Sequence, residues 1–287
     1  MRLRCRWYRR NRTFSSNSRS FGMILQSFGL RNLPETEEFP FNLELVKNLP
    51  YISLKKPVTF FVGENGSGKS TLLEAIAYAS GVPTAGGISI SDDPLMEPAR
   101  DLGKMLSLRY LEKTNRGFFA RAEDFIGFVK NILRSIAELD AEIKDIKETW
   151  TGGDINLALS PLLSERKEIT DRYTENLDAM SHGEGFLKFF NTRITGKGLY
   201  LIDEPEAALS PARQLSLIIL IQEAVKNKGS QFIIATHSPI IMAMQEAQIL
   251  HFENNAIHEI TYTETPHYQL TKAFMDNPER YLRELEG

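Results

Sequence analysis

The run Gly63–Thr71, Gly-Glu-Asn-Gly-Ser-Gly-Lys-Ser-Thr, restricts the possible folds of this chain more than any other segment. It fits the pattern G-x-x-x-x-G-K-[ST] between the apolar stretch Val58–Val62, a predicted strand, and a predicted helix. Glycines let successive backbone N–H groups curl around a polyphosphate, and the helix N-terminus adds its positive dipole. We therefore predict an α/β fold and a chain that binds a nucleoside triphosphate.

Each residue type in this loop has a chemical reason. Lys69 can reach the β- and γ-phosphates, and the hydroxyl of Ser70 can ligate Mg²⁺. The alternative, a glycine loop of no consequence, requires a chance match that we expect in roughly one percent of chains this long. The residues predicted to bind nucleotide here are Glu64, Asn65, Gly66, Ser67, Gly68, Lys69, Ser70 and Thr71.

Length and composition set outer limits. With 287 residues, 42% of them hydrophobic, the chain can form one large α/β domain or one domain with a small lobe. No apolar run approaches the ~20 residues that span a bilayer, so any membrane role requires a separate partner. Cys5 is the only cysteine, which excludes an internal disulfide and suits a reducing compartment such as the cytoplasm.

Charge is concentrated at the N-terminus. Residues 1–34 contain eight arginines and no Asp, Glu or Lys, so a net charge of −3 leaves −11 for the remainder. Three interpretations stay open. The segment can be a tail that results from an upstream start codon, with the folded protein beginning near Met23, a basic arm for nucleic acid, or a targeting segment. We expect residues 1–22 to be a disordered basic leader and 23–287 to form the folded domain.

The N-terminal part of that domain reads as short strands with turn signals. Predicted strands cover Met23–Leu30, Phe41–Val46 and Tyr51–Leu54. Residues 82–98 are rich in Pro, Gly, Ser and Asp and are predicted to be a loop, followed by a strand at Leu106–Leu111.

A helical lobe is predicted at about 122–178. Its apolar seam recurs at steps of three and four: Ile132, Ile136, Leu139, Ile143, Ile146 and Trp150. Thr151–Asp154 breaks this helix, and a second amphipathic stretch follows at Pro161–Leu177, which predicts an antiparallel hairpin. The lobe either packs on its own core or forms an arm that binds a partner.

Beyond the lobe, a strand–helix–strand pattern returns. Its predicted elements are strands at Leu199–Ile202 and Phe232–Ala235, a helix opened by Ser210 and stopped by Gly229, a helix opened by Ser238–Pro239, a hairpin of Ile249–Phe252 with Ile257–Tyr262, and a helix beginning at Asn277–Pro278. The strand at Leu199–Ile202 leads into Asp203 and Glu204. Asp203 is suited to the Mg²⁺ shell and Glu204 to orienting or deprotonating an attacking water. An acid pair at a strand end is common, so this pair means little by itself.

Further segments make the order informative. Met180–Glu184 resembles the ABC signature, usually Leu-Ser-Gly-Gly-Gln, and Ala208–Pro211 occupies the D-loop position. His237 follows Asp203 by 34 residues, at a strand end where that family has its switch histidine. The chain therefore resembles ABC-type ATPases. Taken alone, such a histidine is more often structural, and Ser181 can equally be a helix N-cap.

The variants indicate a subtype. Asp203–Glu206 and Thr236–Pro239 look like the soluble SMC-, RecF- and OLD-type ATPases, and residues 23–285 resemble a family of bacterial predicted AAA-family ATPases. The segments that carry this resemblance are Val58–Thr71, Arg116–Glu123, Ser181–Glu184, Leu201–Arg213, Phe232–Pro239 and Asn277–Arg280. The fold implied is a P-loop NTPase domain of the ABC type, with an N-terminal antiparallel β part and an inserted helical lobe.

The chain departs from the family at the Q-loop. No glutamine occurs between Thr71 and Met180, so the usual Q-loop glutamine is missing. By position Glu123 is the best substitute, coupling nucleotide state to the lobe. The alternative is a surface acid paired with Arg121. The aromatic residue that stacks on the base is not evident either; the candidates are Phe39, Phe41 and Tyr51.

The resemblance implies an ATPase that uses ATP and Mg²⁺ as a head-to-tail homodimer. Lys69, Glu204 and His237 would be catalytic, and Ser70 and Asp203 would hold the metal. Ser181 and Gly183 would meet the γ-phosphate bound to the opposite subunit. We expect coupling to DNA or to an effector protein in repair or phage defence. The alternatives are the ATPase subunit of a membrane transporter and a nucleotide-sensing module with negligible turnover.

Overall fold

The computed structural model describes residues 23–286, except residues 33, 35, 86–89, 92 and 172–181. The side chains of 123–131, 182–186 and 284–286 also lie outside the description. The predicted leader 1–22 and Ser181 are thus not among the described residues. Within the described ranges, no helix combines the length and the apolar character that crossing a membrane requires.

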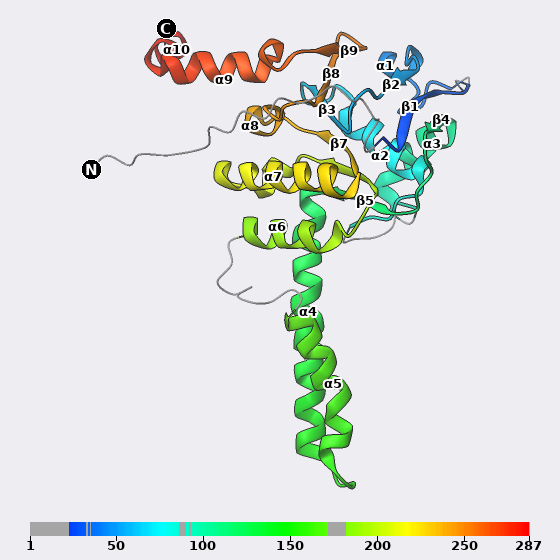
Figure 1. The fold of residues 1–287 in the computed structure, drawn as a ribbon, viewed down its shortest axis with the longest axis vertical. Helices are drawn as coiled ribbons and strands as arrows, with labels where there is room; N and C mark the ends of the chain where they lie inside the picture. Colours follow the sequence, from blue (N-terminus) through cyan, green and yellow to red (C-terminus); the bar gives the residue numbers. More distant parts are fainter. Residues whose placement is uncertain are drawn as a thin grey trace.

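A six-stranded sheet forms the centre of the molecule, in the order β5-β6-β7-β3-β8-β9 (Figure 1). Its strands are β5 (Gly117–Arg121), β6 (Leu199–Asp203), β7 (Gln231–Ala235), β3 (Val58–Gly63), β8 (Gln248–Glu253) and β9 (Ala256–Ile260). All pairings are parallel except β8–β9, which is antiparallel. Every residue of β3, β6 and β7 is buried, because both faces of the sheet are covered. This explains their continuous apolar sequences and confirms these predicted strands.

A smaller antiparallel sheet has the order β2-β1-β4, with β1 at Leu25–Leu30, β2 at Ile52–Ser53 and β4 at Leu106–Tyr110. The buried side chain of Gln231 joins it to the larger sheet: its Oε1 accepts from the backbone N–H groups of Ile24 (2.8 Å) and Leu25 (2.7 Å). Helices α2 (Lys69–Ser80) and α3 (Glu97–Met105) share one hydrophobic core with both sheets. The N-terminal antiparallel part is therefore confirmed, with β4 contributed from further along the chain.

The opposite face of the large sheet has its own core. It is covered by α6 (His182–Arg193), α7 (Pro211–Lys228) and α8 (Pro239–Met242). Ser210 and Gly229 bound α7 as predicted, and Gly229 adopts φ 67°. The chain is completed by the short 3₁₀ turns η1 (Pro94–Met96), η3 (Pro205–Ala208) and η4 (Tyr262–Glu264), and by α9 (Pro266–Asp276) and α10 (Pro278–Glu286).

A helical hairpin projects from the body (Figure 1). It consists of α4 (Ala122–Thr149) and α5 (Ile155–Ile169). The predicted seam is its inner face, since Ile132, Leu139 and Ile143 are buried. Arg166 on α5 pairs with Asp140 on α4, with Nε 2.5 Å from Oδ1.

Three expectations about local structure were wrong. The second helix of the hairpin begins at Ile155 and not at Pro161, because Asp154 caps it by accepting from Asn156 N (2.9 Å). The stretch predicted as a strand at Phe41–Val46 instead leads into the short helix α1 (Glu44–Lys47), whose apolar side chains pack behind the phosphate loop. The predicted loop at 82–98 ends early, since η1 and α3 begin within it, and α9 was not anticipated.

Candidate functional site

The loop Gly63–Gly68 has a backbone that only glycine tolerates at its key positions. Gly63, Gly66 and Gly68 have φ angles of 154°, 78° and 91°. A Cβ on Gly63 would lie 2.4 Å from the carbonyl oxygen of Phe252 on β8. Helix α2 then begins at Lys69 and directs its free N–H groups toward the loop. The loop has the geometry that the sequence pattern requires.

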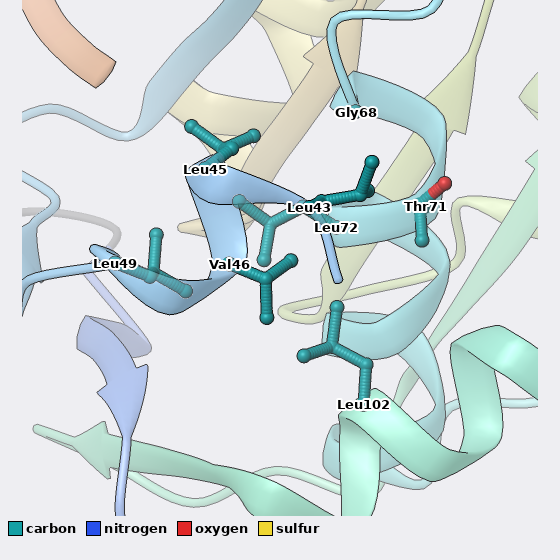
Figure 2. A pocket seen from close by; sticks show the side chains of 8 residues that line it. All are labelled: Leu43, Leu45, Val46, Leu49, Gly68, Thr71, Leu72 and Leu102. Carbon is teal, nitrogen blue, oxygen red and sulfur yellow. The ribbon is translucent and has the colours of Figure 1, made fainter. Parts of the chain in front are cut away.

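Helix α1 supports this loop from behind. Figure 2 shows the apolar cavity between α1, α2 and α3. It is lined by Leu43, Leu45, Val46, Leu49, Gly68, Thr71, Leu72 and Leu102. The Cδ2 atom of Leu45 would lie only 2.9 Å from a Cβ added to Gly68. The helix that replaces the predicted strand at Phe41–Val46 therefore matters for the site, because α1 supplies the surface against which the phosphate loop packs.

Replacing Gly68 with alanine is expected to weaken nucleotide binding and to lower the free energy of unfolding. The left-handed backbone costs about 1–2 kcal/mol for a residue with a Cβ, and the contact with Leu45 adds to this. Gly81→Ala is the matched control, because Gly81 has φ 69° and nothing within 4 Å of its added Cβ. Urea unfolding and titration calorimetry with ATP measure both effects. If Gly68→Ala binds ATP as Gly81→Ala does, the rigid loop is not needed for binding.

Lys69 is folded back onto its own loop. Its Nζ donates to the carbonyl oxygens of Gly63 (2.8 Å) and Glu64 (2.8 Å), and the residue is only 4% exposed. Burial lowers the pKa of this ammonium group, opposed most strongly by the carboxylate of Glu204. The cation is therefore held at the loop, within reach of an incoming phosphate.

Ser70 and Asp203 meet across the end of β6. The Ser70 hydroxyl donates to Asp203 Oδ1 at 3.2 Å. Burial raises the pKa of Asp203 to about 7, and the Ser70 hydroxyl and Lys69 act in the opposite direction. A hydroxyl and a carboxylate side by side fit the hard oxygen ligands of Mg²⁺. Because a ligand must be deprotonated, we expect metal binding here to release a proton near neutral pH.

Glu204 and His237 lie at the ends of neighbouring strands. Glu204 has φ 46°, and its N–H donates to the carbonyl oxygen of Ala235 at 2.9 Å. Its Oε1 lies 3.5 Å from Nε2 of His237. The register of β6 with β7, in which Asp203 faces Ala235, brings these residues together. All the strand-end residues predicted from sequence therefore converge beside the loop.

Two residues that the sequence analysis did not single out bind His237 and its neighbour. The carboxylate of Glu206 accepts from Thr236 Oγ1 (2.8 Å) and from the N–H of His237 (2.5 Å). The Nδ1 of His237 lies 2.9 Å from Nε2 of His267 on α9, so one imidazole donates to the other. Glu206 had a signal, its place directly after Asp203–Pro205. His267 had none, because α9 was not predicted.

The open side of the loop forms a hollow. It is lined by Phe39, Leu43, Asn65, Gly66, Gly68, Lys69, Ser70, Thr71 and Glu204. Of the three aromatic candidates for base stacking, Phe39 lines this hollow and is 52% exposed. Phe41 is buried, and Tyr51 lies under the guanidinium of Arg109 (4.8 Å to the ring centre).

The remaining predicted residues are placed less fully. Glu123 lies in the first turn of α4, but its side chain is outside the description, so its proposed coupling role stays a prediction. Arg121, its alternative ion-pair partner, has Nη2 3.4 Å from Oδ2 of Asp93 and Nη1 3.8 Å from Oε1 of Glu74. Gly183 is in α6, which packs against α7 and η3.

The chain is similar to several known proteins and family models. Two family models match: "AAA domain" over residues 30–94, and "AAA domain, putative AbiEii toxin, Type IV TA system" over residues 124–243. The vitamin B12 import ATP-binding protein BtuD of Vibrio atlanticus is 33% identical over 189 residues, which are 63% of this chain and 68% of that protein. The lipoprotein-releasing system ATP-binding protein LolD of Ehrlichia chaffeensis is 23% identical over 215 residues, 74% of this chain and 85% of that protein.

Among solved structures, the SMC head bound to the C-winged helix domain of ScpA is similar, with a TM-score of 0.47 and 17% identity over 82% of this chain and 97% of that one. A phosphate loop between β3 and α2, beside strands that end in acids and a histidine, defines a P-loop nucleoside triphosphatase fold. The chain belongs to the ABC-type P-loop ATPases, and it is an ATP-hydrolysing enzyme.

Proposed function

We propose that two copies of this chain associate head to tail around two ATP molecules, and that hydrolysis allows the pair to open. The loop residues with Lys69 would bind the phosphates, and Ser70 with Asp203 would hold Mg²⁺. Glu204 would accept a proton from the attacking water, while His237 contacts the γ-phosphate. Ser181 and Gly183 would complete the site of the opposite subunit.

The proposal rests on one observation: the polar side chains line one side of the site, and its other side opens to solvent. Five polar side chains converge at one sheet edge: Lys69, Ser70, Asp203, Glu204 and His237. The Glu204 side chain is nevertheless 44% exposed, and the hollow beside it opens to solvent. A transferring phosphoryl group needs donors around all its oxygens. A second copy that covers the open side would supply the missing contacts.

The proposed mechanism depends on how Glu204 and His237 are placed relative to each other. Glu204 Oε1 lies 3.5 Å from His237 Nε2, so the carboxylate and the imidazole face the same space. Glu206 and His267 fix His237 through its backbone N–H and its Nδ1. The Nε2 of His237 is thereby directed into the site. Phe39, which lines the same hollow, is the aromatic residue that we propose stacks on the base.

Turnover that depends on pairing is tested by dilution. We expect the ATPase rate per chain to rise with protein concentration and to level off where light scattering shows a dimer in Mg-ATP. A single chain that is monomeric by the same measurement should hydrolyse slowly. A rate per chain that stays constant down to concentrations where only monomer is present contradicts the proposal.

The cellular role that we propose is an ATP-gated switch coupled to DNA or to an effector protein. Two features support it: the projecting α4–α5 hairpin, which offers a surface for a partner, and the toxin–antitoxin description of the family model over residues 124–243. A second candidate is the ATPase subunit of a transporter. It is favoured by the relatives, whose names describe B12 import and lipoprotein release.

A further inference from the structure

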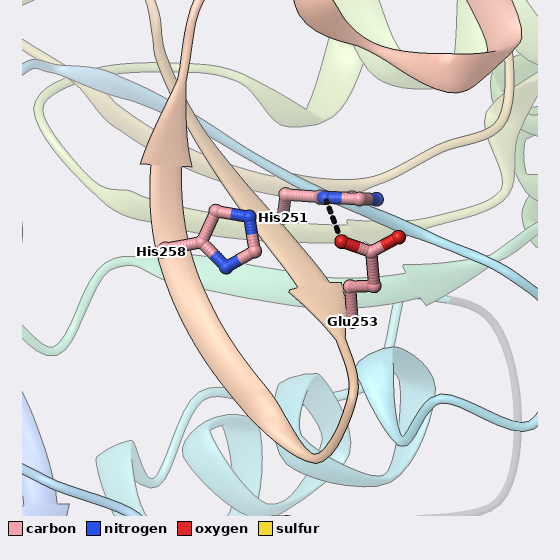
Figure 3. A group of neighbouring side chains, drawn as sticks. All are labelled: His251, Glu253 and His258. Atoms are coloured by element: carbon pink, nitrogen blue, oxygen red, sulfur yellow. Dashed lines mark ion pairs between the residues drawn. The ribbon is translucent and has the colours of Figure 1, made fainter.

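The hairpin of β8 and β9 carries three side chains of types that can ligate a metal ion, outside the nucleotide site (Figure 3). His251 on β8 faces His258 on β9 in the antiparallel register, and their rings lie 5.2 Å apart between centres. Glu253 is two residues after His251, and side chains two apart along a strand point to the same face. Each of the three offers a ligand atom, and these atoms all lie within 4.8 Å of one another.

His251 lacks a hydrogen-bond partner. The residue is 5% exposed, and its Nδ1 lies 3.9 Å from Glu253 Oε2, which is too long for a hydrogen bond. Among the described residues, the ion pair with Glu253 is the contact found for its ring nitrogens, and no hydrogen bond to them is found. A neutral imidazole keeps a lone pair on one ring nitrogen, so this ring has an electron pair available to a metal ion.

We propose that His251, Glu253 and His258 bind one divalent transition-metal ion of the Zn²⁺ type. Two imidazoles and one carboxylate are a donor set typical of Zn²⁺, whereas Mg²⁺ and Ca²⁺ prefer oxygen ligands throughout. Three protein ligands leave the fourth position of a tetrahedral ion open to water.

The geometry needs only side-chain adjustment. Ligand atoms around a tetrahedral Zn²⁺ stand about 3.4 Å apart, against the 3.9 Å found between His251 and Glu253. Glu253 and His258 are exposed, so both can rotate toward the ion, while the buried His251 fixes its position. The backbone of the hairpin, paired from Ile249–Ile260 to Glu253–Ala256, can stay as it is.

The site lies one strand from the phosphate loop. In the pairing of β3 with β8, Val62 faces His251 and Gly63 faces Phe252. An ion on the hairpin would therefore tie β8 to β9 immediately beside the point where the chain enters the loop. The metal site itself does not depend on dimer formation or on hydrolysis.

Titration calorimetry of the nucleotide-free full chain with Zn²⁺, without a histidine tag, tests the proposal. We expect a binding event that His258→Ala and Glu253→Gln each weaken by at least about tenfold, since even partners of metal ligands contribute that much. Glu259→Gln is the matched control: it removes a carboxylate from the same hairpin but on the other face, and should leave Zn²⁺ affinity unchanged. Excess Mg²⁺ should not displace the Zn²⁺.

If Zn²⁺ binds elsewhere, for example beside Asp203, the affinity of that site will be the same in wild type and in His258→Ala. The proposal is overturned if wild type and His258→Ala bind Zn²⁺ with equal affinity and stoichiometry, if wild type binds none, or if Mg²⁺ competes on equal terms. Because His258 is exposed, the variant should unfold at the wild-type temperature. If His258→Ala unfolds at a lower temperature, the Co²⁺ absorption spectra of wild type and of the folded Glu253→Gln protein are compared instead. A spectrum that is the same in both proteins overturns the proposal.

Discussion

Replacing Lys69 with alanine is expected to weaken ATP binding by about two to three powers of ten. Hydrogen bonds to charged groups contribute about 1.5–3 kcal/mol each. The ammonium group, which here donates to the carbonyl oxygens of Gly63 and Glu64, can exchange these bonds for stronger ones to phosphate. Lys69 is also the only cation among the residues that line the hollow. Titration calorimetry with ATP, at one fixed salt concentration, measures the loss.

Lys104→Ala is the control for this experiment. Lys104 is exposed on α3 and pairs with Asp101 at 2.7 Å, so its removal changes the net charge equally without touching the hollow. We expect its ATP affinity to stay within twofold of wild type. Unfolding temperatures of both variants show whether the loop has collapsed, because Lys69 also satisfies two loop carbonyl groups. A folded Lys69→Ala protein with wild-type ATP affinity would rule out the predicted phosphate contact.

Replacing Glu204 with glutamine is expected to slow hydrolysis by at least about a hundredfold, the contribution of a positioned general base, while leaving ATP binding intact. Glutamine keeps the shape of the side chain, and the N–H bond to Ala235 that holds this left-handed residue does not involve the carboxylate. With Mg-ATP present, the variant should accumulate as a dimer. Phosphate release and light scattering report the two effects separately.

The control for Glu204→Gln is Glu223→Gln, which removes a carboxylate from the exposed side of α7. It should hydrolyse ATP at the wild-type rate and dimerise only transiently. A Glu204→Gln chain that stays monomeric in saturating Mg-ATP would contradict the head-to-tail pair, though not the ATPase fold. Components that purify with the trapped dimer from its host identify the partner: DNA or an effector protein supports the switch, and a membrane-spanning protein supports the transporter subunit.

Local sequence was a good guide where one physical requirement dominates. Strands β3, β6 and β7 are buried on both faces, so their sequences are mostly apolar runs that are easy to recognise. The start and end of α7 follow from Ser210–Pro211 and Gly229. It failed at Phe41–Val46, where apolar residues spaced for a strand fold as α1 because they pack on the back of the phosphate loop. It also missed α9, whose N-cap Thr265 is buried but whose helix is exposed along most of its length.

The sequence by itself determined the phosphate loop, the acids after β6 and the histidine after β7, since each depends on residue types within a few positions. Only the tertiary structure decided which distant groups complete them. Glu206 reaches His237 because β6 and β7 pair in parallel, and His267 reaches it because α9 packs against α8, which follows His237 in the chain. Likewise the meeting of His251 with His258 depends on the register of β8 with β9. Such contacts are set by strand pairing and packing, which no short stretch of sequence encodes.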